Sequence, residues 1–381
     1  MVEQIGEMGG AAKAQPLFQP FEMPGLSLTN RIVMAPMTRS FSPAGVPGLD
    51  VAAYYRRRAE GGVGLIITEG TWVPHPSASN LPNAPCFYGE DALAGWSHVA
   101  DEVHAAGGKI IPQLWHVGQI ERAGAATAPN RGQRIGPSGM VGSMGAPPTA
   151  QERPSTVAEI EAVGEAYVTA AISAYRLGFD GVELHAAHGY LFDQFFWHVT
   201  NLRDDIYGGD LAARTQFAAD VVRNIRANTS PTFPIVLRIS QWKQQDYGAK
   251  LAETPQSLEA LLAPLADAGV DIFHCSQRRF WEGEFGTDLN LAGWAKKLTG
   301  KPTITVGSVT LKQDLIASLH GAASETAKNL DQLLALFERG DFDLVAVGRA
   351  LIVDPDWPIK VKAGFENELL PYSPEALQRL L

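Results

Sequence analysis

Residues 179–190, FDGVELHAAHGY, join a short apolar run to three polar ring side chains. The run at 182–184 predicts a buried strand, and His185, His188 and Tyr190 follow it. In parallel α/β proteins, residues just past the carboxyl end of a strand face the ligand crevice. There the three groups can bind an oxygen that gains negative charge and supply a proton. They can equally be buried polar residues that cap a strand, and this segment alone does not decide between the two.

The composition is that of a globular protein with a sizeable core. The chain has 381 residues, of which 45% are hydrophobic and 19% charged, enough for two average domains or one large barrel. The net charge of −10 argues against a nucleic-acid or anionic-membrane partner. No apolar run approaches the ~18 residues of a membrane span.

The chain end and the cysteines indicate a cytoplasmic protein. Residues 1–16 lack the apolar region of a secretory signal, so we expect a flexible N-terminal lead-in before one domain at 17–381. Cys86 and Cys275 lie far apart without a CxxC pair, which gives neither a disulfide framework nor a cysteine-ligated iron–sulfur cluster within the chain.

Eight short apolar runs rich in Val and Ile recur along the chain, nearly continuous as in strands buried on both faces. They lie at 31–37, 63–69, 109–114, 179–185, 234–240, 270–275, 302–306 and 342–347. Helical patterns separate most of them, at 91–106, 156–178, 211–226, 255–268 and 327–339. Eight such units without a linker predict an α/β fold, a single (β/α)8 TIM barrel, with a doubly wound open sheet as the alternative.

Two irregular stretches interrupt the repeat. Residues 120–154 are rich in Gly, Pro, Ala and Ser and form a long excursion after the third strand, expected to be a lid or subdomain over the site. Residues 277–290 follow the sixth strand, and Phe280, Trp281 and Phe285 there either line the mouth of the barrel or pack the loop.

Polar and small residues at the other strand ends suit a single site. The carboxamide of Gln113 can donate and accept at once, which suits a heterocycle. Arg238 lies inside an apolar run, so it needs a structural ion-pair partner or a ligand. The last two strands end at a place where barrels often bind phosphate, and the residues there are Gly307, Ser308, Gly348 and Arg349.

The motifs at these strand ends resemble the old yellow enzyme family of FMN-dependent ene-reductases. They are APMTR, ITEG, QLWHVG, ELHAAHGYL, NLRDDIYGG, VLRIS, VGSV and VGRALIVDPDW, in order from about residue 17 to 358. The resemblance implies non-covalent FMN, NAD(P)H as co-substrate, an activated alkene as substrate, and a homodimer.

The resemblance also implies roles for individual residues. Cofactor-binding residues would be Ala35, Pro36, Met37, Thr38, Gly70, Gln113, His185, Arg238, Gly307, Ser308, Gly348 and Arg349. His185 and His188 would bind the substrate oxygen, Tyr190 would donate the proton, and Trp115 would line the substrate pocket. The stretches at 240–247 and 277–285 fit neither main branch of the family, and Trp242 and Trp281 there are candidate substrate contacts.

Three other functions remain open from the sequence. A metal-dependent hydrolase could use His185 and His188, but further ligands are lacking and no metal is expected. A barrel isomerase or aldolase acting on a phosphorylated substrate could use Glu69. The third is a non-catalytic flavin-binding barrel.

Overall fold

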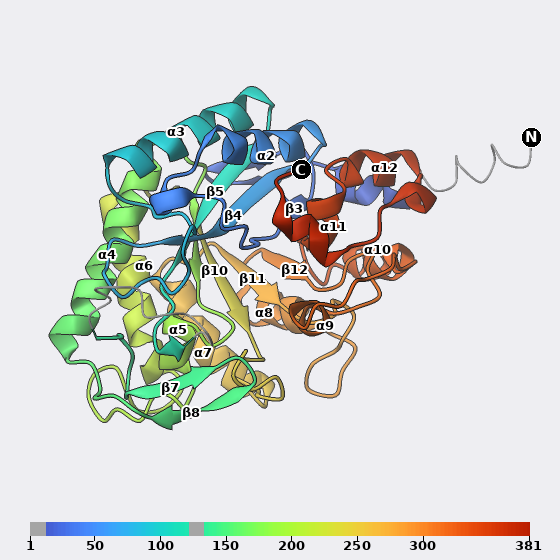
Figure 1. The fold of residues 1–381 in the computed structure, drawn as a ribbon. Helices are drawn as coiled ribbons and strands as arrows, with labels where there is room; N and C mark the ends of the chain where they lie inside the picture. Colours follow the sequence, from blue (N-terminus) through green and yellow to red (C-terminus); the bar gives the residue numbers. More distant parts are fainter. Residues whose placement is uncertain (1–12, 122–132) are drawn as a thin grey trace, which may run out of the picture.

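The computed structural model describes residues 13–121 and 133–381 and shows one closed parallel barrel (Figure 1). Around the barrel the strands follow the order β10, β11, β12, β13, β3, β4, β5, β9. Their bounds are β3 Ile32–Met34, β4 Leu65–Trp72, β5 Lys109–Trp115, β9 Val182–His185, β10 Ile235–Ser240, β11 Ile272–Ser276, β12 Thr303–Val306 and β13 Leu344–Val347. This confirms the single (β/α)8 barrel and excludes the open sheet.

The strands form where they were predicted because their side chains are buried on both faces. In all eight strands, every residue except the half-buried Lys109 at the start of β5 is buried. The observed β3 stops at Met34, three residues before the end of the predicted run. The chain from Ala35 onward leaves the ladder and becomes available to line a site.

Helices surround the barrel (Figure 1). The α-helices are α2 Leu49–Glu60, α3 Glu90–Ala105, α4 Val157–Arg176, α5 Leu191–Phe196, α6 Gln216–Asn228, α7 Pro255–Ala268, α8 Leu291–Thr299, α9 Leu315–Leu319, α10 Leu330–Glu338, α11 Arg349–Val353 and α12 Trp357–Ala363. Short 3-10 helices span Gln15–Phe18, Pro43–Gly45, Ala213–Thr215, Glu366–Glu368 and Pro374–Gln378. The predicted capping box of α4 is present: the Thr156 side chain accepts from the Glu159 backbone N–H, and the Glu159 side chain accepts in return.

A hairpin packs against the inner core of the barrel. It consists of β1 (Phe21–Met23) and β2 (Leu26–Leu28), which pair antiparallel. Phe21, Leu26 and Leu28 join one apolar cluster with buried residues of seven barrel strands. No pattern in the sequence predicts this hairpin. Of the predicted lead-in, residues 1–12 lie outside the described residues, while Ala14 is fully buried.

The excursion after β5 forms a small sheet of its own, below the barrel in Figure 1. Its strands are β6 Ile120–Glu121, β7 Met140–Ser143 and β8 Ala146–Ala150. Residues 122–132 of the predicted lid lie outside the described part of the chain. In the ranges 13–121 and 133–381, no helix is long and apolar enough to cross a membrane.

Candidate active site

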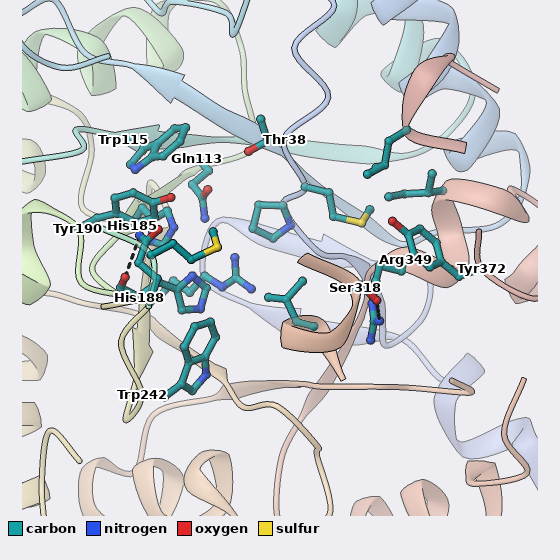
Figure 2. A pocket seen from close by; sticks show the side chains of 18 residues that line it. Thr38, Gln113, Trp115, His185, His188, Tyr190, Trp242, Ser318, Arg349 and Tyr372 are labelled. Atoms are coloured by element: carbon teal, nitrogen blue, oxygen red, sulfur yellow. Dashed lines mark hydrogen bonds between the residues drawn. The ribbon is translucent and has the colours of Figure 1, made fainter. Parts of the chain in front are cut away.

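A cavity of about 260 Å³ opens among the carboxyl ends of the strands. Figure 2 shows Trp115, Tyr190, His185, His188 and Trp242 grouped at one end, and Ser318, Arg349 and Tyr372 at the other. Its wall also contains Pro36, Met37, Thr38, Gln113, Met144, Arg238, Gln244, Leu315, Ile352 and Leu377. Side chains predicted from five strand ends therefore meet in one place.

A second, narrower cavity of about 90 Å³ adjoins the first. The two share wall residues, and the narrow one adds the predicted phosphate residues of the last two strands. The shared residues are Pro36, Met37, Arg238, Leu315 and Arg349. The residues added include Ala35, Arg278, Gly307, Ser308 and Gly348. The site is thus elongated, with the ring side chains at its wide end and small residues with arginines at its narrow end.

The three ring side chains of the opening motif converge. The ring centroid of His185 lies 5.2 Å from that of His188 and 4.8 Å from that of Tyr190. Trp115 packs edge-on against Tyr190 at 4.8 Å, and Trp242 stacks on His188 at 4.3 Å. The strand-capping interpretation does not account for this, because all three line the cavity.

His188 holds an unusual backbone conformation. Its φ is +64°, in the left-handed region that side chains other than Gly, Asn, Asp and His rarely adopt, and Gly189 follows at +79°. The His188 backbone N–H donates to the hydroxyl of Ser240 at 2.9 Å, and its Nε2 lies 2.8 Å from the hydroxyl of Ser276. The chain therefore turns sharply between the two histidines and Tyr190.

A buried ion pair supports this turn from behind. Lys243 Nζ lies 2.8 Å from Asp193 Oδ1, and both side chains are fully buried. Asp193 also accepts from the Gly189 backbone N–H at 2.7 Å, while Lys243 donates to the carbonyl of Gln241 at 3.1 Å. Burial raises the pKa of Asp193 and lowers that of Lys243. Residues 240–247, one of the two stretches that fit neither main branch, thus support the turn through Lys243. Trp242 in the same stretch lines the cavity.

Both histidines are neutral because they are buried beside a cation. Burial, and next the charge of Arg238, hold the pKa values of His185 and His188 well below the usual range. A neutral imidazole has one donor and one acceptor nitrogen. His185 Nδ1 is buried without a hydrogen-bond partner among the described residues. An oxygen atom of a ligand in the cavity can be the hydrogen-bond partner of this nitrogen.

Arg238 is buried and poorly satisfied by the protein. Its Nη2 lies 3.4 Å from the Ser276 hydroxyl, and its Nε has no partner within the described ranges. Burial lowers its pKa, and the nearby Glu183 partly offsets this. Leaving a buried guanidinium unpaired costs free energy, so the site suits an electron-rich ligand. Arg238 forms no ion pair within the described residues, so a structural salt bridge does not explain its burial.

Gln113 is fixed by a buried network. Its Nε2 donates to Glu183 Oε1 at 2.7 Å, and His274 Nδ1 lies 2.6 Å from Glu183 Oε2. All three side chains are buried. The carboxamide is therefore held in one orientation on the cavity wall.

Some predicted residues do not reach the cavities. A Cβ on Gly70 would lie 2.4 Å from Cε3 of Trp115, so this glycine makes room for the indole. Trp281 packs edge-on against Phe280 at 4.9 Å and lines neither cavity.

Two alternative chemistries also lose support. Glu69 accepts backbone hydrogen bonds from Arg39 and Ser40 and is absent from both cavity walls, so it is not placed as a base for an isomerase or aldolase. Across residues 13–121 and 133–381, no group of three or more His, Cys, Asp or Glu side chains can hold a metal ion.

Some wall residues come from remote segments and are not predicted by the sequence. Met144 lies in the turn between β7 and β8, while Tyr372 and Leu377 come from the C-terminal segment. Arg39 holds that segment in place by donating to the carbonyls of Ala376 and Arg379, at 3.0 and 2.7 Å. No local pattern marks such residues, because only the tertiary fold brings them to the site.

The fold and this site define a barrel with an elongated cavity at its strand ends, lined by ring side chains at one end and by small residues with arginines at the other. The chain matches the NADH:flavin oxidoreductase / NADH oxidase family over residues 16–368. It is 34% identical to the NADH oxidase of Thermoanaerobacter brockii over 93% of this chain and 52% of the relative, so it spans about half of that protein's length. It is 33% identical to 12-oxophytodienoate reductase 7 of Oryza sativa subsp. japonica over 90% of this chain and 87% of the relative.

Solved structures agree. Morphinone reductase in complex with tetrahydroNAD superimposes with a TM-score of 0.78 at 29% identity, covering 95% of this chain and 93% of that one. The old yellow enzyme homologue from Zymomonas mobilis gives 0.75 at 26% identity, covering 95% and 96%. The chain belongs to the NADH:flavin oxidoreductase / NADH oxidase family, the old yellow enzymes, and is an NAD(P)H-dependent flavin oxidoreductase.

Proposed function

We propose that this chain is an ene-reductase that binds FMN non-covalently along its two-part cavity. Thr38, Gln113 and Arg238 would hold the ring system at the wide end, with Ala35, Pro36 and Met37 beside it. Gly307, Ser308, Gly348 and Arg349 would hold the phosphate at the narrow end. The unpaired Arg238 Nε supports this fit, because an electron-rich ring edge satisfies it.

Bound FMN would take a hydride from NAD(P)H and pass it to the β-carbon of an α,β-unsaturated carbonyl or nitro compound, in a ping-pong cycle. His185 and His188 would donate hydrogen bonds to the substrate oxygen, on which negative charge develops. Removing one such donor typically costs ~3 kcal/mol of transition-state stabilisation. Tyr190 would then deliver a proton to the α-carbon.

The convergence of His185, His188 and Tyr190 carries this proposal. The ring centroid of His185 lies 5.2 Å from that of His188 and 4.8 Å from that of Tyr190, and Trp115 and Trp242 flank the three rings with apolar surface. Oxygen-binding donors and a proton donor thus face one small volume. This is the arrangement that reduction of a polarised alkene requires.

The test uses the purified protein under anaerobic conditions. We expect flavin absorbance that bleaches on addition of NADH or NADPH and returns on addition of cyclohexenone. A protein that cannot be loaded with FMN, or whose reduced flavin is not reoxidised by any enone or nitroalkene, would contradict the proposal.

The same proposal includes a lid and an assembly. Met144 in the cavity wall supports residues 133–154 of the excursion, which the structure describes, as a cover for the site. Met144→Gly should change KM for bulky enones more than KM for small ones. A homodimer of this 41.0 kDa chain would show twice that mass by light scattering.

A further inference from the structure

Arg278 lies in the segment after β11 and lines the narrow cavity together with Gly307, Ser308, Gly348 and Arg349. No sequence pattern assigns it a role. It is half-buried and lies in residues 277–285, one of the two stretches that fit neither main branch of the family.

Three neighbouring arginines differ in what they bind. The Arg349 guanidinium donates to the carbonyls of Gln313 and Asp314, at 2.6 and 2.9 Å, and to the Ser318 hydroxyl. Arg279 pairs with Glu282 at 2.9 Å and with Asp314 at 3.3 Å.

Arg278 has no such partners. Within residues 13–121 and 133–381, its guanidinium makes no hydrogen bond or ion pair. Three arginines line the narrow cavity, and two of them, Arg238 and Arg349, also line the wide one. Arg349 is largely occupied by the protein and Arg238 is the cation proposed for the ring system, so Arg278 is the arginine of the narrow end with its donors available.

The main chain of Arg278 is pinned to the cavity floor. The Ser308 hydroxyl donates to the carbonyl of Arg278 at 2.9 Å. Gly307 adopts φ +146°, and a Cβ there would lie 3.0 Å from the Arg278 carbonyl carbon. The close approach fixes where the arginine side chain begins, beside the backbone of Gly307 and Ser308.

We infer that Arg278 binds the phosphate group of the cofactor from the wall of the narrow cavity. A phosphate monoester carries close to two negative charges at neutral pH, and a guanidinium can bind two of its oxygens in parallel. Arg349 would contact the phosphate with only part of its donors, because it also holds Gln313, Asp314 and Ser318, and Arg278 would add a second guanidinium. This inference rests on the proposed function, because it takes FMN as the occupant.

The test compares two flavins that differ only in the phosphate. Apoprotein is titrated with FMN and with riboflavin, and binding is followed by quenching of flavin fluorescence. We expect the wild-type protein to prefer FMN. Arg278→Ala should weaken FMN binding roughly 10- to 100-fold, the range for loss of a charged hydrogen bond, and leave riboflavin binding unchanged.

Two further variants make the result specific. Arg279→Ala is the matched control, since it removes the adjacent arginine outside the narrow cavity, and it should leave the FMN-to-riboflavin ratio unchanged. Arg278→Lys should retain part of the preference because the charge remains. Inorganic phosphate should compete with FMN in the wild type and much less in Arg278→Ala.

Several results would overturn the inference. Equal weakening of both flavins by Arg278→Ala would show a structural role. An unchanged ratio with a raised KM for NADH or NADPH would assign Arg278 to a third cavity of about 220 Å³, which it lines with Trp242, Tyr247 and Lys250. Wild-type apoprotein that binds neither flavin would refute the proposed function itself, and one that binds both equally would refute only the phosphate site.

Discussion

The two ends of the cavity are built differently. At the β9 end, the turn at His188 and Gly189 is fixed by bonds within the protein, from Ser240, Lys243 and Asp193, and these groups are buried. At the narrow end, Arg278 is half-buried with no protein partner among the described residues. The end proposed for the chemistry is therefore set before a ligand arrives, whereas the end proposed to anchor the cofactor leaves the charge of Arg278 for the ligand to neutralise. Preorganisation is needed where charge develops during the reaction.

The first way to test this comparison is to remove the proton donor alone. Tyr190→Phe should slow alkene reduction by about 10²- to 10⁴-fold, the usual contribution of a general acid. Reduction of the flavin by NAD(P)H should change little, because that step requires no proton from Tyr190. Stopped-flow absorbance separates the two half-reactions, and equal slowing of both would refute the dedicated role.

The ion pair between Lys243 and Asp193, which supports the turn at His188 and Gly189, should have a large effect on stability. Lys243→Met leaves Asp193 buried without its partner, which typically costs about 3–5 kcal/mol. We expect this loss in the free energy of unfolding measured in urea. The double variant Lys243→Met with Asp193→Leu should recover much of it, since no buried charge remains.

Recovery of stability need not restore the turn. In the double variant the Gly189 backbone N–H loses its acceptor, so alkene reduction should stay slow while flavin reduction remains near normal. If the double variant reduced alkenes at the wild-type rate, the ion pair would stabilise the fold without positioning the site.

Glu69 accepts backbone hydrogen bonds from the two residues that follow Thr38. Its burial predicts that the stability of the protein depends on pH. Burial raises its pKa to about 7, against 4.5 for an exposed glutamate, despite two backbone hydrogen bonds and the charge of Arg39. The folded state therefore favours the protonated form. This contribution to stability is complete below pH 4.5 and is lost as the pH rises to about 7, by about 3 kcal/mol in all.

Glu69→Gln isolates this effect. The free energy of unfolding of the wild type relative to the variant should fall as the pH rises from about 4.5 to 7 and stay constant above that. Taking the difference cancels the contribution of the buried histidines to the pH dependence, because they titrate in both proteins. A difference that is independent of pH would contradict the raised pKa.

The smallest expected effect concerns the backbone at His188. Asn tolerates the left-handed conformation and Gln does not, although Gln is closer to His in size. We expect His188→Gln to be about 1 kcal/mol less stable than His188→Asn in urea unfolding. Greater stability of the Gln variant would show that side-chain volume, and not backbone conformation, governs this position.

The sequence predicted the barrel well because its strands are buried on both faces and give continuous apolar runs. It predicted most of the site because parallel strands bring their ends together. The prediction of the site failed where the direction in which a residue faces decides its role. Gly70 lies near a strand end as predicted, but its lack of a Cβ makes room for the indole of Trp115. It could not reveal the pair Lys243–Asp193, whose partners lie 50 positions apart.

The central claim is that His185 and His188 together bind the oxygen of the substrate. The direct measurement is the affinity of the FMN-loaded protein for a simple phenol, whose oxygen imitates the developing oxyanion, followed by the change in flavin absorbance. The account predicts that His185→Ala with His188→Ala weakens this binding by roughly 10³-fold or more, from the loss of two donors, while flavin remains bound. Unchanged phenol affinity in the double variant would contradict it.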